Sequence, residues 1–397
     1  MSAVETQLTI LARRYETGEP VRVTVSAGKV ERVEPAWPLG SVDDWPWIAP
    51  GLFDLQVNGY GGTSFTGTDV TPERAAAAIR SYLAHGVAQI CPTVVTNSFE
   101  SLACGLAAVH QACLQDPVVA AMVPGCHLEG PYLSGEDGPR GAHPRQHIRP
   151  ADWSEFLRLQ DASGNRICLV TIAPEVEGAV VFIRKAVAAN VTIAIGHTGA
   201  DSSQIAAAVD AGARLSTHLG NGCHIQLPRH PNYLWDQLGE SRLAASIITD
   251  GHHLPAAVAR SIVRAKGIGN TVITCDASGW AGCAPGRYQT SLGDVEVRAD
   301  GKIVVAGQDR ILAGSGATTE VCVAQAAAFG AATLREAIDM ACRNPTRLLG
   351  FREYRLMAGD AAHLFVYHPP TAESPAFRIL STIVAGRVAW GEIPVPA

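Results

Sequence analysis

The chain has 397 residues, of which 47% are apolar and 17% charged, so its composition fits a folded protein with a large core and excludes a disordered one. The formal net charge is −6 and long basic runs are absent, which argues against nucleic acid or an anionic membrane surface as the main partner. The ten cysteines are scattered without a Cys-x-x-Cys pair, so we expect neither a zinc knuckle nor a disulfide framework. We found no run of 18 apolar residues and no signal-peptide pattern at the N-terminus, and therefore expect a soluble cytoplasmic protein without a membrane partner.

Both ends of the chain have the sequence pattern of short β-strands. The first fifty residues read as strands separated by Pro20, Gly28 and Pro35, and strand patterns return from about Met357. The sequence predicts that residues 1–49 and 357–397 pair as one small β-sandwich domain. Residues 50–356 are then left as a second, larger domain.

The larger domain alternates between apolar runs and helical patterns. One predicted helix covers 71–86, with Thr71 as its N-cap and Gly86 after its end. Eight candidate strands are separated mostly by such helices: 47–59, 88–95, 120–130, 167–175, 191–198, 213–221, 243–253 and 271–278. Eight such units in roughly 250 residues are typical of a closed (β/α)8 barrel of the α/β class. An open, doubly wound sheet is the alternative, and residues 287–312 interrupt the pattern with what reads as a β-hairpin.

Four polar side chains stand at the C-terminal ends of candidate strands. They are Glu129, His197, His218 and Asp276. In a parallel barrel these ends meet at one rim, which is where barrel enzymes carry their active sites. Catalytic zinc sites use about three protein ligands, and Glu129, His197 and His218 supply that number. Asp276 is placed to act as a general base and acid toward an attacking water and a leaving group.

Further polar residues follow the same strands. Gln56 and Asn58 end the first strand, on one face; because amides are weak zinc ligands, they suggest hydrogen bonding around a single metal ion. His143 lies in the loop after the third strand, where it would polarise a carbonyl or remain an ordinary surface histidine. In the loop after the sixth strand, Arg229 is the best candidate to hold an anionic group such as phosphate.

The order of motifs resembles one known family. PGLFDLQVNGYGG, HLEGP, TIAPE, GHT, THLGNG, TDGHHL, CDAS and LAGS follow one another as in the N-acetylglucosamine-6-phosphate deacetylases of the amidohydrolase superfamily. The resemblance spans nearly the whole chain and implies a (β/α)8 barrel with a small β-sandwich from both termini. It also implies deacetylation of an amino-sugar phosphate with one divalent metal ion per subunit, most simply zinc, with iron or manganese as alternatives.

The resemblance assigns roles by position. It implies metal ligation by Glu129, His197 and His218, acid and base chemistry by Asp276, and polarisation of the acetyl carbonyl by His143. Gln56 and Asn58 stand where many superfamily members have His-x-His, as in a single-metal branch. Substrate contacts are implied for Asn221, Gly222, Arg229 and His253, with the arginine reaching the neighbouring subunit of a homodimer.

Three segments depart from the family pattern. Residues 221–224 read Asn-Gly-Cys-His where the family has Asn-Ala-Met, the loop after HLEGP is shorter, and 278–282 differ from the usual continuation. All three touch the expected substrate pocket, so two alternatives stay open. One is an amidohydrolase for another N-acyl amino sugar or amide, and the other is a carbohydrate-binding barrel without catalysis.

Overall fold

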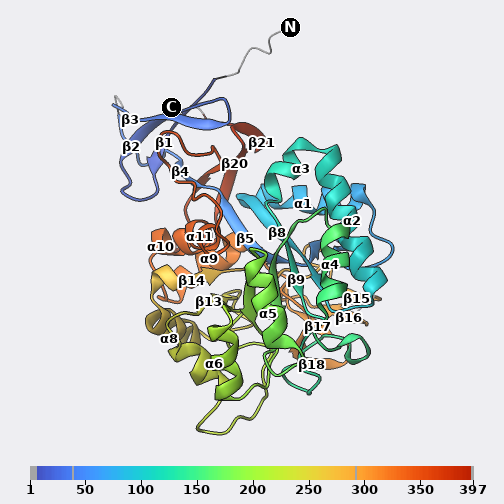
Figure 1. Cartoon of the computed structure of the whole chain (residues 1–397). Coiled ribbons are helices and arrows are strands. Elements are labelled where there is room, and N and C mark those ends of the chain that lie inside the picture. Colours follow the sequence, from blue (N-terminus) through green and yellow to red (C-terminus); the bar gives the residue numbers. More distant parts are fainter. Residues whose placement is uncertain (1–6, 38–39, 291–292, 395–397) are drawn as a thin grey trace.

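A computed structural model describes residues 7–37, 40–290 and 293–394 of the chain. Its centre is an eight-stranded parallel sheet in the order β5-β8-β9-β10-β11-β12-β13-β14 (Figure 1). The strands are β5 (Leu52–Val57), β8 (Val87–Val95), β9 (Cys126–Glu129), β10 (Ile167–Ile172), β11 (Thr192–Ile195), β12 (Leu215–Ser216), β13 (Ala244–Ile247) and β14 (Thr271–Ile273).

The first and last strands of this sheet meet, which closes the barrel. Val57 forms a parallel bridge with Ala277, and the amide of Asn58 donates to the carbonyl of Ala277 at 2.9 Å. β5 is buried along its whole length, as expected for a strand covered on both faces. The alternative of an open, doubly wound sheet is therefore wrong.

Helices surround the barrel and return the chain between successive strands. They are α1 (Pro72–Ser81), α2 (Phe99–Gln115), α3 (Pro117–Met122), α4 (Trp153–Ala162), α5 (Ala179–Ala188), α6 (Ser202–Asp210), α7 (Tyr233–Gly239), α8 (Ala256–Lys266), α9 (Thr319–Ala328), α10 (Leu334–Met340) and α11 (Arg343–Leu348). Within the described ranges, none of the helices has the length and apolarity needed to cross a bilayer.

One predicted strand begins as a helix. We expected strand over 120–130, but α3 occupies Pro117–Met122 and β9 begins only at Cys126. The Asp116 side chain accepts hydrogen bonds from the amides of Val118 and Val119, and Pro117 suits the first helical position. A short apolar run has no periodicity that separates a buried helix from a strand, so this capping signal decides.

The two chain ends form a second sheet of seven strands on one side of the barrel (Figure 1). Its order is β21-β20-β19-β4-β1-β2-β3, with β1 (Leu8–Arg14), β2 (Pro20–Ser26), β3 (Lys29–Pro35), β4 (Trp47–Pro50), β19 (Leu364–His368), β20 (Arg378–Val384) and β21 (Arg387–Gly391). Its neighbours are antiparallel except β1 and β4. The bounds 1–49 with 357–397, and 50–356, remain our proposed division into domains.

The predicted strand 47–59 is divided between the two sheets. β4 belongs to the seven-stranded sheet and β5 to the barrel, with Gly51 between them. A Cβ atom on Gly51 would lie 2.4 Å from the Cβ of Ala88, so only glycine allows the chain to pass this close to β8. A continuous apolar pattern cannot reveal this change of sheet, because both halves are buried.

The interruption at 287–312 is larger than the predicted hairpin. It is a four-stranded antiparallel meander of β15 (Gly286–Tyr288), β16 (Val295–Val297), β17 (Ile303–Val305) and β18 (Gln308–Leu312). A smaller ribbon of β6 (Gly59–Tyr60) and β7 (Thr63–Ser64) follows β5. Both insertions follow the C-terminal ends of barrel strands, so they belong to the rim that carries the candidate site.

Candidate metal centre and active site

The four strand-end residues reach the barrel mouth through unusual backbone turns. Glu129 is the last residue of β9, whereas His197, His218 and Asp276 come two or three residues after β11, β12 and β14. These last three have positive φ angles of 50°, 29° and 51°. Residues other than glycine rarely adopt this left-handed region, and such strain is concentrated at functional sites.

Three of these side chains bring their polar atoms to one point. His218 Nε2 lies 3.1 Å from Glu129 Oε1 and 3.1 Å from His197 Nε2, and His197 Nε2 lies 3.4 Å from Glu129 Oε1. All three residues are at least 90% buried. Ligand atoms of a tetrahedral zinc site, each about 2.0–2.1 Å from the ion, are about 3.3 Å apart. The donor set and its spacing therefore fit a divalent metal ion.

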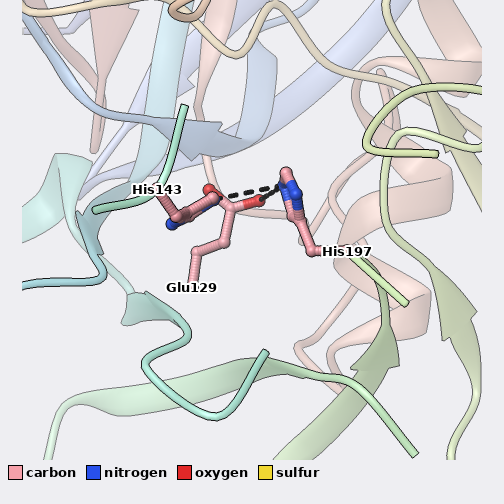
Figure 2. Close-up of side chains that lie close together, drawn as sticks. All are labelled: Glu129, His143 and His197. Carbon is pink, nitrogen blue, oxygen red and sulfur yellow. Dashed lines mark hydrogen bonds and ion pairs between the residues drawn. The ribbon is translucent and has the colours of Figure 1, made fainter. Parts of the chain in front are cut away.

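His143 approaches the same point from a loop. Its Nε2 lies 3.2 Å from His197 Nε2, and the ligand atoms of Glu129, His143 and His197 all lie within 4.8 Å of one another (Figure 2). His143 and His218 thus flank His197, and either could complete a set of three ligands. His218 fits that place better, because its Nε2 is in contact with both other ligand atoms. His143 is then left free to face a substrate.

Neighbouring groups fix the ring of His197. Its Nδ1 lies 2.8 Å from the carbonyl oxygen of Pro139, to which it donates, so the lone pair is on Nε2, the atom in the cluster. Gly222 packs against this ring: a Cβ on it would lie 2.7 Å from His197 Nδ1, and its φ is 58°. Gly222 therefore lies beside the ring of His197, and its contact with a substrate stays a prediction.

Burial and charge set the protonation of the cluster. Burial alone would raise the pKa of Glu129, but its contacts with His197 and His218 hold it well below its ordinary value. Burial opposes the charged form of His218 as well, yet contact with Glu129 leaves its pKa raised. Burial, together with the nearby His197, lowers the pKa of His143 to about 3, so this ring is neutral at pH 7.

Asp276 lies beside the cluster and is held by two amides. Its Oδ1 accepts hydrogen bonds from Gln56 Nε2 at 3.0 Å and Asn58 Nδ2 at 2.7 Å, and Gln56 Nε2 also donates to Glu129 Oε1 at 2.9 Å. Burial and the charge of Glu129 raise the pKa of Asp276 to about 6. Gln56 thus links the two carboxylates through its amino group, and Asn58 holds Asp276, which suits hydrogen bonding around one metal ion.

The remaining candidates lie around the rim. Asn221 donates to the carbonyl oxygen of His218 at 3.2 Å. His253 Nδ1 lies 2.8 Å from Asp250 Oδ2, and Asp250 also accepts from Ser315 at 2.7 Å. Arg229 is exposed on the loop between His218 and α7, and the structure does not bring it into the cluster.

Asp54 is an important residue that our sequence reasoning missed. It is fully buried and accepts hydrogen bonds from the Gln56 amide at 3.0 Å, the Cys275 amide at 2.8 Å, Thr319 Oγ1 at 2.7 Å and the Thr274 hydroxyl. It therefore ties β5 to the segment that leads from β14 to Asp276. Its position two residues before Gln56, on the same face, was the available signal.

Replacing Asp54 with alanine is expected to destabilise the protein by about 3–5 kcal/mol, because buried donors lose their charged acceptor. Urea denaturation measures the effect. Asp161→Ala, an exposed carboxylate on α4, is the matched control and should change stability by less than about 0.5 kcal/mol. Equal stability of the two variants would contradict the structural role of Asp54.

A layer of polar side chains below the cluster was also missed. His127 is fully buried two residues before Glu129, and its Nε2 lies 2.8 Å from Thr171 Oγ1, which in turn lies 2.8 Å from Thr217 Oγ1. Burial lowers the pKa of His127 to about 4, so it is neutral. The layer supports the cluster from the barrel interior.

Comparison with known proteins agrees with this fold and site. The sequence profile of the amidohydrolase family matches residues 47–389, and the chain belongs to this family. It is 32% identical to the N-acetylglucosamine-6-phosphate deacetylase of Homo sapiens over 359 residues, 86% of this chain and 83% of that one. It is equally identical to the N-acetylgalactosamine-6-phosphate deacetylase of Escherichia coli O157:H7 over 330 residues, 83% of this chain and 85% of that one.

A solved structure of a relative has the same fold as this chain. A mutant N-acetyl-D-glucosamine-6-phosphate deacetylase of Mycobacterium smegmatis, in complex with N-acetyl-D-glucosamine-6-phosphate, is 31% identical to this chain. The two structures agree with a TM-score of 0.84, covering 98% of this chain and all of that one. The expected barrel and the expected relationship to deacetylases of this kind are both confirmed.

Proposed function

We propose that this chain is a metal-dependent deacetylase that hydrolyses the N-acetyl amide of an amino-sugar 6-phosphate, foremost N-acetylglucosamine 6-phosphate. The observation that carries the proposal is the convergence of Glu129, His197 and His218 on one point beside Asp276. Relatives of this chain act on both the gluco and the galacto sugar. The products would be acetate and the amino-sugar 6-phosphate with a free amine.

The metal ion would be held by Glu129, His197 and His218. When bound, it would supply Lewis acidity that polarises the acetyl carbonyl and lowers the pKa of a water molecule. Zinc is our first choice, since a set of one carboxylate and two imidazoles suits it well, with iron or manganese as alternatives.

Asp276 performs the proton transfers. Gln56 and Asn58 both donate to its Oδ1, which leaves Oδ2 to take a proton from the attacking water. The same oxygen then gives the proton to the departing amine as the amide bond breaks. The two amides keep the carboxylate oriented through both steps.

His143 assists at the carbonyl. Its ring is neutral and buried, so one ring N–H can donate a hydrogen bond to the carbonyl oxygen as negative charge develops there. Asn221, Gly222, His253 and Arg229 are proposed to contact the sugar phosphate. We further propose a cytoplasmic homodimer, in which Arg229 reaches the phosphate bound by the neighbouring subunit.

The ionisation of Asp276 predicts the acid side of the pH profile. Because the base must be deprotonated, kcat/KM should fall as the pH drops through about 6, or through a lower value if the bound cation stabilises the carboxylate. Asn58→Ala removes a hydrogen bond that lowers the pKa of Asp276, so it should move this limb to higher pH. If the acid limb of the kcat/KM profile does not move in this variant, the ionisation that causes it belongs to a group other than Asp276.

The proposal is tested by following acetate release from N-acetylglucosamine 6-phosphate and its galacto epimer, before and after chelation and return of the metal. We expect turnover of at least one epimer that disappears and returns with the metal. Turnover confined to other N-acyl compounds would favour the related amidohydrolase. Binding of the sugar by fully metal-loaded protein without turnover would favour the carbohydrate-binding barrel.

A further inference from the structure

A cavity lies away from the metal centre, next to α11 and the segment that follows it. It has a volume of about 520 Å³, which is within the usual range for small-molecule sites. Phe351 lies in its lining together with six charged side chains, which are Arg343, Arg347, Arg352, Arg355, Glu353 and Asp360.

This cavity belongs to the opposite end of the barrel. Phe351 faces Phe53 near the start of β5, with ring centroids 6.3 Å apart, and α11 contacts β5 and β14. The metal ligands, in contrast, stand at or beyond the C-terminal ends of their strands. The cavity is therefore separate from the proposed deacetylase site, and nothing in that reaction requires it.

The arginines of the cavity are poorly satisfied by their acidic neighbours. Arg343 and Arg347 lie 3.5 and 3.9 Å from Glu353, and Arg352 and Arg355 lie 3.7 and 3.9 Å from Asp360. Arg343 also lies 3.6 Å from Asp339. Charge-assisted hydrogen bonds are about 2.7–2.9 Å long, so all five contacts are too long to be good ones. Arg343 Nε is in addition buried without a hydrogen-bond partner among the described residues.

Ion pairs elsewhere in the chain show what a purely structural pair looks like. Arg80 pairs with Asp116 at 2.6 Å, using two nitrogens and both carboxylate oxygens. Arg149 reaches Glu155 at 3.0 Å. The cavity arginines lack such close contacts with carboxylates. Arg347 Nη2 donates to the carbonyl oxygen of Gly269 and to Asn344 Oδ1, whereas Arg343, Arg352 and Arg355 are left with long ion pairs.

Charge and shape define the chemistry of a ligand that would fit. Four guanidinium groups face Glu353 and Asp360 in the lining and Asp339 beside Arg343, which leaves about one positive charge in a chain whose net charge is −6. Guanidinium forks bind phosphate oxygens in pairs, and a phosphate monoester carries close to two negative charges at neutral pH. We propose that this cavity binds a small molecule through a phosphate monoester dianion. Its volume leaves room for a sugar or a nucleoside beside the phosphate.

Calorimetric titration of the metal-loaded protein with AMP tests this site, because AMP carries the phosphate dianion without an N-acetyl sugar. Glucose 6-phosphate, titrated in parallel, distinguishes a sugar from a nucleoside as the attached group. We expect at least one of the two to bind, with inorganic phosphate as a competitor and with an affinity that falls as salt is added. Lack of binding of both at millimolar concentration, or failure of phosphate to compete, would overturn the proposal.

Variants locate the binding. Arg352→Gln with Arg355→Gln should weaken it about tenfold or more, since two charge-assisted contacts are lost. The single Arg352→Gln changes a largely exposed side chain and keeps the test valid if the double variant does not fold. Arg335→Gln, exposed on α10 and outside the cavity, removes the same charge and should leave the affinity within about twofold.

Glu353→Gln provides a test in the opposite direction. Glu353 competes with the ligand for Arg343 and Arg347, so its neutralisation should tighten phosphate binding severalfold. If these residues formed only a structural ion-pair cluster, Glu353→Gln would weaken that cluster and would not increase the affinity for phosphate. Equal losses in the cavity variants and in Arg335→Gln, or weaker binding by Glu353→Gln, would contradict the assignment.

Discussion

Replacing Asp276 with asparagine is expected to lower kcat by about 10³-fold or more while the protein keeps its metal ion, because the amide cannot take or return the proton. Asparagine has nearly the same shape and can still accept through its carbonyl oxygen from Gln56 and Asn58. Acetate release measures turnover, and elemental analysis of the dialysed protein measures metal.

Two results would contradict this role. Substantial turnover by Asp276→Asn would mean that another group carries the proton. Loss of the metal together with activity would mean that Asp276 is itself a ligand, although its Oδ1 hydrogen bonds go to the two amides in the structure. The Asn58→Ala variant is a useful comparison, because it keeps the Asp276 carboxylate but removes one of the hydrogen bonds that orient it.

Replacing His197 with alanine is expected to weaken metal binding by more than about 100-fold, the upper range seen when only an outer partner of a ligand is lost. His197 Nε2 lies within 3.4 Å of the ligand atoms of Glu129 and His218 and also contacts His143, so its loss removes one corner of the cluster. Metal content after dialysis against a chelator, with turnover in parallel, measures the effect.

His368→Ala is the matched control, because this histidine lies on β19 in the seven-stranded sheet. It should retain both metal and turnover. If His197→Ala also bound the metal normally, the cluster would have to be explained as an internal hydrogen-bond network. The same experiment on His143→Ala separates the two candidates for the third ligand: we expect metal to be retained there and lost in His218→Ala.

The barrel and its rim could be predicted because the end of each strand can be recognised in the sequence as an apolar run followed by a polar residue. Apolar runs that stop at Glu129, His197 and His218 place ligand-competent side chains at one edge of a parallel sheet, whatever their separation in the sequence. Asp276 follows the same rule. Composition and alternation therefore sufficed for the fold class, and the resemblance added the reaction.

Other features depend on tertiary contacts that the sequence pattern does not carry. The break at Gly51 follows from the approach of β5 to Ala88, and the buried role of Asp54 from donors more than two hundred residues away. His143 could be a surface histidine by sequence, and only the folded loop brings it to His197. The loosely paired arginines of α11 and of the segment after it likewise become visible only as the lining of a cavity.

The most direct test of the proposed activity compares amine release from N-acetylglucosamine 6-phosphate and from N-acetylglucosamine by protein loaded with one equivalent of zinc. We predict turnover of the phosphorylated sugar with a much higher kcat/KM than that of the free sugar. Turnover of neither sugar, with the metal fully bound, would contradict the proposed deacetylase.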